Sequence, residues 1–209
     1  MTAPTILVAG LGRCGSSLVM QMLNAGGVPT IGLYPAFEDE SEVALRGDPA
    51  AWHALTAGKA VKILDPHLTP PPAAGSYRTI LLTRSIDEQA KSMLKFAGAP
   101  ASRHDRRAME ALLRRELDQA RKALTGIGTG MYFSIPFEDL ITEPLKTAFA
   151  IAGFVTTYWT QPLDPGAMAA CVRDRAPECL PYLLEPELLA SCSALPPNWS
   201  PNNTHGEKV

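Results

Sequence analysis

The chain has 209 residues, of which 46% are hydrophobic and 19% are charged, and its formal net charge is −2. This is the composition of one globular domain with a sizeable core. The near-neutral charge gives no sign of a nucleic-acid or anionic-membrane partner, and no apolar segment approaches the ~20 residues that span a bilayer. A basic leader region is also absent, so we expect a cytoplasmic protein.

Apolar and amphipathic patterns alternate along the chain. In chain order they predict a strand at 5–9, a helix at 16–25, an acidic loop at 29–47, a helix at 49–57, strands at 60–64 and 77–83, helices at 86–96 and 105–124, a strand at 131–136 and a helix at 144–153. This order favours an α/β fold of three layers, with a mostly parallel sheet of about four to five strands flanked by helices. We expect a single domain over residues 1–195 and a disordered tail over 196–209.

The cysteines are spaced too irregularly for a metal or disulfide framework. They are Cys14, Cys171, Cys179 and Cys192, and no pair has CxxC spacing. We therefore expect no metal site. Cys14 precedes a predicted helix, where a thiolate is favoured, but a small residue tolerated in a loop is the simpler interpretation.

A glycine-rich turn joins the first predicted strand to the first predicted helix. Gly10, Gly15 and Ser17 fit the pattern G-x-x-x-x-G-K-[ST], in which backbone N–H groups and a helix N-terminus face a phosphate. Ser16 stands where that pattern has its phosphate-binding lysine, and Arg13 is the cation of the loop. The loop therefore predicts phosphate binding without ordinary Mg·ATP chemistry.

A second candidate anion site follows the third predicted strand. Arg84 ends this strand, and Ser92 lies eight residues later on the next helix. An arginine with a hydroxyl suits a phosphate monoester. Because ligands of parallel sheets bind beyond the carboxyl ends of the strands, we expect Arg84 and the glycine loop at the same edge. The alternative for Arg84 is a structural ion pair with Asp87 or Glu88.

Together these motifs resemble the sulfotransferases that use 3′-phosphoadenosine 5′-phosphosulfate (PAPS). The family's loop P-[KR]-S-G-T-[ST] is similar to Gly12-Arg13-Cys14-Gly15-Ser16-Ser17, although Gly12 and Cys14 replace Pro and Ser. The family's strand-end Arg, with Ser eight residues later, is similar to Arg84 and Ser92. Residues 18–29 look like those of bacterial members, and Phe137-Glu138-Asp139-Leu140 with Pro144 resembles a late YEDL…P segment. The resemblance covers about residues 5–155 and implies a P-loop fold.

The resemblance also implies roles for individual residues. The N–H groups of residues 12–17 and the hydroxyls of Ser16 and Ser17 would hold the 5′-phosphate of PAPS, with no metal required. Arg13 would neutralise the bridging oxygen as the S–O bond breaks. Lys62, inside the apolar strand 60–64, would place a cation over the sulfonate. The alternative for Lys62 is an edge-strand lysine that reaches water.

A base is needed to accept the proton of the nucleophile. His67 follows the second strand, as a histidine does in the family, but Asp65-Pro66 shifts the register. Glu38 lies with Glu40 in the acidic loop, where bacterial members place acidic residues. Asp65 is a third candidate. Of the three we favour Glu38.

The sequence thus predicts transfer of a sulfuryl group from PAPS to a hydroxyl or amine of a small-molecule, glycan or lipid acceptor. One alternative is a P-loop nucleotide kinase or NTPase with residues 61–65 as its metal-binding strand, against which the missing loop lysine counts. Another alternative is a degenerate, non-catalytic nucleotide-binding module.

Overall fold

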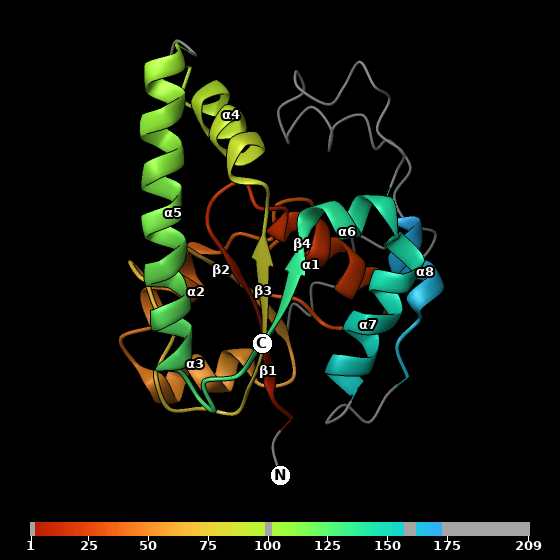
Figure 1. The fold of residues 1–209 in the computed structure, drawn as a ribbon. Helices are drawn as coiled ribbons and strands as arrows, with labels where there is room; N and C mark the ends of the chain where they lie inside the picture. The colour runs from red at the N-terminus through yellow and green to blue at the C-terminus, as the bar shows by residue number, and fades with distance from the viewer. Residues whose placement is uncertain (1–2, 99–101, 157–161, 173–209) are drawn as a thin grey trace.

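The computed structural model describes residues 3–98, 102–156 and 162–172. At its centre lie four parallel strands: β1 (Thr5–Gly10), β2 (Ala60–Leu64), β3 (Tyr77–Thr83) and β4 (Tyr132–Pro136). Their order is β2-β1-β3-β4, so the first strand is central and the chain crosses over to either side of it. All four carboxyl ends therefore lie at one edge of the sheet (Figure 1).

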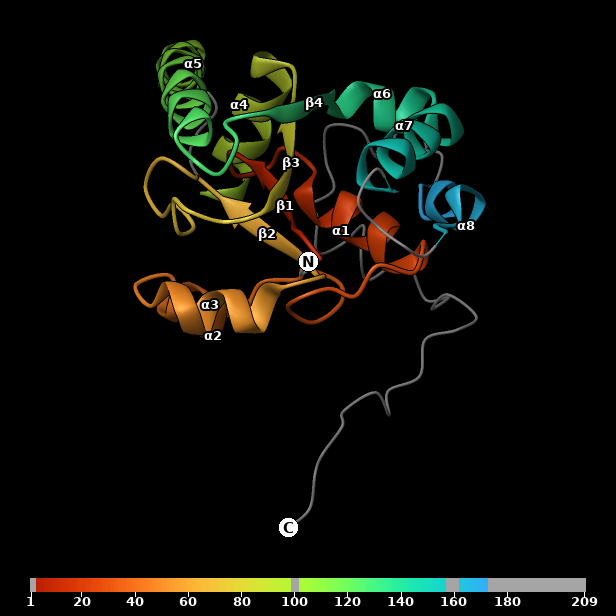
Figure 2. The ribbon, with the colours of Figure 1, turned by 90° about the horizontal axis from the view of Figure 1, so that it is seen from below.

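Helices cover both faces of this sheet (Figure 2). They are α1 (Ser16–Ala25), α2 (Glu40–Leu45), α3 (Pro49–Thr56), α4 (Ile86–Phe96), α5 (Arg103–Thr125), α6 (Phe137–Thr142), α7 (Pro144–Thr156) and α8 (Pro165–Ala170). Ile6 and Val8 of β1 belong to the core cluster that contains α1, α6, α7 and α8. Leu7 and Ala9 belong to the opposite cluster, with Trp52 of α3. The alternation of side chains along β1 thus serves two layers of core.

The predicted fold class is confirmed, because a parallel sheet lies between two layers of helices. The bounds of α1, β2, β3 and α4 coincide with their predicted ranges. The predicted tail at 196–209, and the domain end at 195, lie outside the described residues. Within the part of the chain that is described, no helix is long and apolar enough to cross a membrane.

The prediction of a loop over residues 29–47 is wrong in part, because this segment contains α2. Asp39 caps the helix by accepting from the N–H groups of Ser41 and Glu42, and the hydroxyl of Ser41 lowers the pKa of Asp39. Glu42 is 2% exposed and accepts from Arg46 and from the indole N–H of Trp52. Partners of the buried Glu42 carboxylate therefore help to order a segment that the sequence predicts as an acidic loop.

Candidate functional site

Three of the predicted segments meet at the carboxyl side of the sheet. The glycine loop follows β1, Lys62 lies in β2, and Arg84 directly follows β3. Because β2 and β3 pair with opposite sides of β1, they approach the loop from two directions. We call Lys62 with Glu38 the β2 flank, and Arg84 with Arg13 and Ser92 the β3 flank.

Close packing requires two glycines of the loop. A Cβ on Gly15 would lie 2.4 Å from Cδ2 of Phe137, and the φ of Gly15 is 98°, which side chains rarely adopt. A Cβ on Gly10 would lie 2.5 Å from Sγ of Cys14. Cys14 itself is 1% exposed, so its thiol packs inside the loop and lacks the access that a reactive cysteine needs.

Some backbone N–H groups of the loop bind other parts of the protein. The N–H of Gly12 donates to Oδ1 of Asp65 (N···O 3.3 Å), and the N–H of Cys14 donates to the carbonyl of Leu11 (3.3 Å). The N-cap of α1 is Gly15, which has no side chain that could cap the helix. The N–H groups of a first helical turn lack intrahelical acceptors. The N-terminus of α1 is therefore the part of the predicted phosphate loop that best fits an anion.

Lys62 reaches the loop from the neighbouring strand. Its Nζ donates to Oγ of Ser17 (2.9 Å), to the carbonyl of Ala36 (3.0 Å) and to Oε1 of Glu38 (2.8 Å). The side chain of Lys62 is only 5% exposed, although β2 is an edge strand. The alternative of a lysine that reaches water is therefore wrong. A cation stands beside the loop even though Ser16 has replaced the usual loop lysine.

The three candidate bases lie in different environments. Glu38 pairs with Lys62, and its side chain is 64% exposed. Asp65 has a φ of 48° and accepts from the loop N–H of Gly12. His67 follows in the turn after β2; within the described part of the chain its Nδ1 is buried without a hydrogen-bond partner. The structure thus joins Glu38 to Lys62, and Asp65 to the loop backbone.

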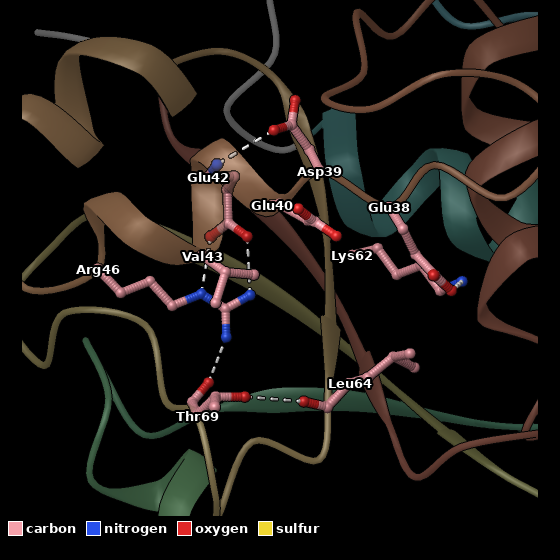
Figure 3. A pocket seen from close by; sticks show the side chains of 9 residues that line it. All are labelled: Glu38, Asp39, Glu40, Glu42, Val43, Arg46, Lys62, Leu64 and Thr69. Atoms are coloured by element: carbon pink, nitrogen blue, oxygen red, sulfur yellow. Dashed lines mark hydrogen bonds and ion pairs between the residues drawn. The ribbon is translucent and has the colours of Figure 1, made fainter.

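A pocket of about 220 Å³ opens beside the β2 flank (Figure 3). It is lined by Glu38, Asp39, Glu40, Glu42, Val43, Arg46, Lys62, Leu64 and Thr69. Arg46 fixes one wall, because it pairs with Glu42 at 2.8 Å and donates to the carbonyl of Thr69. Arg46 is not among the site residues predicted from the sequence, although its (i, i+4) spacing from Glu42 is typical of an ion pair on a helix.

On the β3 flank, Arg84 and α4 hold the backbone of the loop. Nη1 of Arg84 donates to the carbonyl of Arg13 (3.1 Å), and its Cζ lies 4.8 Å from the ring centroid of Phe137. Nε2 of Gln89, on the same helix as Ser92, donates to the carbonyl of Gly12 (2.7 Å).

The carboxylates proposed as alternative partners of Arg84 pair with another cation. Nζ of Lys91 lies 2.7 Å from Asp87 and 2.8 Å from Glu88. The hydrogen bond from Lys91 lowers the pKa of Asp87 below its usual value. Arg84 is thus positioned by the loop and by Phe137, as a residue of the site would be.

The side chain of Arg13 points toward α4. Its Nε donates to Oγ of Ser92 (3.1 Å), and its Cζ lies 5.3 Å from the ring centroid of Phe96. The backbone of Arg13 has a φ of 65°. The residues matched to the 3′-phosphate signature are therefore linked through Arg13, since Arg84 binds its carbonyl and Ser92 binds its side chain.

In residues 3–98, 102–156 and 162–172, no group of three or more His, Cys, Asp or Glu side chains is arranged to hold a metal ion. The cations Arg13, Lys62 and Arg84 and the hydroxyls of Ser17 and Ser92 are groups that bind anions, and they share this edge with the carboxylates of Glu38 and Asp65.

Solved structures of sulfotransferases have the same fold. Mouse sulfotransferase SULT7A1 complexed with PAP is matched with a TM-score of 0.52 at 12% identity, over 82% of this chain and 63% of that chain. Sulfotransferase STF1 from Mycobacterium tuberculosis H37Rv is matched with a TM-score of 0.51 at 12% identity, over 88% of this chain and 75% of that chain. No family model and no curated protein sequence matches the chain. The resemblance found in the sequence is confirmed at the level of the fold.

Proposed function

We propose that this protein is a sulfotransferase that moves a sulfuryl group from PAPS to a hydroxyl or amine of a small-molecule, glycan or lipid acceptor. The observation that carries the proposal is that cations flank the glycine loop on both sides. Lys62 contacts Ser17 from β2, and Arg84 contacts Arg13 from β3. A sulfotransferase that uses PAPS needs cations for the phosphates of the nucleotide and a further cation for the sulfuryl group.

The β3 flank fits the nucleotide. The N-terminus of α1 would bind the 5′-phosphate, because its first N–H groups and the helix dipole favour an anion there. Arg84 and Ser92 would bind the 3′-phosphate through charge-assisted hydrogen bonds. PAPS supplies the activated sulfuryl group when it is bound, and this part of the protein holds and orients it.

The β2 flank fits the transfer of the sulfuryl group. Nζ of Lys62 is held in a buried position by fixed partners, so its charge can stabilise developing negative charge without reorganisation. Glu38 lines the adjacent pocket and would accept the proton of the acceptor. Asp65 and His67 remain the alternatives for this base. The acceptor would enter through the pocket beside Glu38. The cytoplasmic location of the protein stays a prediction.

Calorimetry tests the nucleotide site. We expect adenosine 3′,5′-bisphosphate to bind without metal and more tightly than ADP with Mg²⁺. Arg84→Ala should weaken binding of the bisphosphate at least about tenfold, or about 1.4 kcal/mol, because one charge-assisted contact is lost. Lys91→Ala removes a cation from the same region and should leave binding unchanged, because Lys91 pairs with Asp87 and Glu88. A preference for Mg·ADP would favour the kinase or NTPase alternative instead.

Turnover separates an enzyme from an inactive nucleotide-binding module. Labelled PAPS would be incubated with a panel of alcohols, amines, glycans and lipids, and the sulfated product measured. We expect at least one acceptor to be sulfated at a rate that depends on Lys62. Tight binding of the bisphosphate with no product from any class of acceptor would support the inactive module.

A further inference from the structure

We propose that the buried pair of Glu42 and Arg46 positions the acceptor side of the site, because it holds helix α2 against the turn after β2 and thereby sets where Glu38 lies. This inference rests on the proposed function and gives the pair a role beyond forming a wall of the pocket. Neither Glu42 nor Arg46 would react. Both would act through Glu38, as positioning residues.

Helix α2 is too short to be stable by itself. It has six residues, Glu40–Leu45, and isolated helices of fewer than about 12 residues are marginal in water. In proteins, most of the stability of such a helix comes from tertiary contacts. Contacts with the rest of the protein must therefore hold α2 in place.

The carboxylate of Glu42 makes contacts of this kind. It accepts from Nε1 of Trp52 in α3 at 2.6 Å, and from Nε and Nη2 of Arg46 at 2.9 and 2.8 Å. The side chains of Glu42 and Arg46 are 2% and 8% exposed. A buried charge needs a partner, and a guanidinium that binds both oxygens of a carboxylate is a strong and directional one. Glu42 thus joins α2 to α3 and fixes the direction of Arg46.

Arg46 extends this connection to the turn after β2. Its Nη1 donates to the carbonyl of Thr69, and the hydroxyl of Thr69 donates to the carbonyl of Leu64 (3.4 Å), the last residue of β2. Figure 3 shows Arg46 pointing toward both Glu42 and Thr69 in the lining of the pocket. One guanidinium therefore connects α2 to the strand that also carries Lys62.

Glu38 depends on this connection because it lies between two anchored segments. On its N-terminal side, Phe37 is 3% exposed and packs in the core cluster that contains α1. On its C-terminal side, Asp39 is the N-cap of α2. The side chain of Glu38 is itself 64% exposed. A displacement of α2 would therefore move the backbone beside Glu38, and with it the carboxylate relative to Lys62 and to an acceptor in the pocket.

Amide hydrogen exchange tests the structural part of the inference without any acceptor. Arg46→Met removes the guanidinium and keeps an unbranched side chain, so exchange in residues 40–45 should become at least about tenfold faster. Arg46→Lys should give an intermediate rate, because it restores the charge without the fork of donors. Unchanged exchange in Arg46→Met would overturn the inference.

Thr56→Val is the matched control for a general loss of stability. It removes a buried hydrogen bond between the hydroxyls of Thr5 and Thr56, at the end of the helix that carries Trp52. Exchange in residues 40–45 should change less than about twofold in this variant. An increase as large as that in Arg46→Met would mean that the buried pair has no specific role in holding α2.

Turnover tests the functional part, with labelled PAPS and with benzyl alcohol, benzylamine and 1-hexanol as acceptors. We expect Arg46→Met to raise the acceptor KM about tenfold and to lower kcat about tenfold, because base and acceptor are no longer aligned. Affinity for adenosine 3′,5′-bisphosphate should change less than about twofold. In a protein that already carries Glu38→Gln, Arg46→Met should lower kcat less than about twofold further, since it acts through the lost carboxylate.

A milder variant serves if circular dichroism shows that Arg46→Met does not fold. Trp52→Phe removes the indole donor to Glu42 and keeps an aromatic ring in the core. We expect the loss of this one hydrogen bond to raise the acceptor KM and the exchange rate in residues 40–45 about threefold each. No change in either quantity would overturn the inference.

The outcomes separate the inference from the proposed function. If Arg46→Met lowered kcat and left the acceptor KM unchanged, as a loss of folded protein would, the inference would be wrong and the proposed function would stand. The same conclusion follows if Arg46→Met lowered kcat as strongly with Glu38→Gln as without it. A wild-type protein that sulfates no acceptor of any class would overturn the proposed function, and the inference with it.

Discussion

The two flanks of the glycine loop carry cations in different settings. On the β2 flank, the ammonium of Lys62 is buried, bonded to three oxygen atoms and opposed by the carboxylate of Glu38. On the β3 flank, the guanidinium groups of Arg13 and Arg84 contact a hydroxyl, a carbonyl and aromatic rings. The β2 flank thus has a fixed, paired charge next to a pocket. The β3 flank has two planar guanidinium groups, of which Arg13 donates to the hydroxyl of Ser92 and Arg84 donates to the loop backbone.

This difference indicates that the two flanks have separate roles. A fixed cation in a water-poor position suits the stabilisation of charge that develops during a reaction. Planar guanidinium groups suit recognition of a phosphate that does not react. Substitutions on the β2 flank should therefore change turnover, and substitutions on the β3 flank should change nucleotide affinity.

The largest effect is expected from Lys62→Met, which keeps the length of the side chain and removes its charge. We expect turnover to fall about 10² to 10³-fold, because a preorganised charge beside the reacting group is lost. Affinity for adenosine 3′,5′-bisphosphate should change less than about threefold. The measurements are the rate of sulfation and calorimetry. If Lys62→Met lowered the affinity for the bisphosphate as much as the rate of sulfation, the two flanks would not have separate roles.

A smaller loss of turnover is expected from Glu38→Gln. The amide cannot accept a proton at neutral pH, so the rate should fall about 10²-fold while nucleotide affinity is kept. Glu40→Gln is the matched control, since Glu40 lines the same pocket and does not pair with Lys62 in any contact described above. Parallel assays of Asp65→Asn and His67→Ala complete the comparison. A larger loss in either of them than in Glu38→Gln would assign the base to that residue.

The smallest effect is expected from Ser92→Ala on the β3 flank. Loss of one hydrogen bond costs about 1 kcal/mol, so affinity for the bisphosphate should fall about fivefold and turnover at saturation should stay the same. Ser85→Ala, at the start of α4, is the control, because the hydroxyl of Ser85 makes no cap to the helix. An unchanged affinity in Ser92→Ala would remove Ser92 from the nucleotide site.

The sequence predicts the sheet and the helices beside it well, because their patterns are local. The strands at 60–64 and 77–83 are short apolar runs between polar turns, and the helix at 86–96 has a clear amphipathic pattern. The sequence does not predict α2, because this helix is held by contacts of Glu42 with Trp52 and with Arg46. The indole N–H that Glu42 accepts belongs to Trp52 on the next helix, so the residues of α2 alone do not reveal this contact.

The candidate site shows the same limit. Loop and strand-end motifs identify Arg13, Lys62, Arg84 and Ser92 as candidates, and strand order alone brings their backbones to one region. The direction of each side chain depends on distant partners. Lys62 turns to Ser17 because the carbonyl of Ala36 and the carboxylate of Glu38 lie there as well. Such contacts become visible only once the chain is folded.

Phe137, the first residue of α6, couples the order of this helix to the order of the glycine loop. Its ring lies where a side chain on Gly15 would be, and the guanidinium of Arg84 lies over it. A nucleotide that orders the loop or Arg84 therefore also stabilises α6. By linkage, an ordered α6 strengthens binding of that nucleotide. Amide hydrogen exchange in residues 137–142 should slow when a nucleotide binds. A fragment that ends before Phe137 would keep every residue of the loop and still bind weakly.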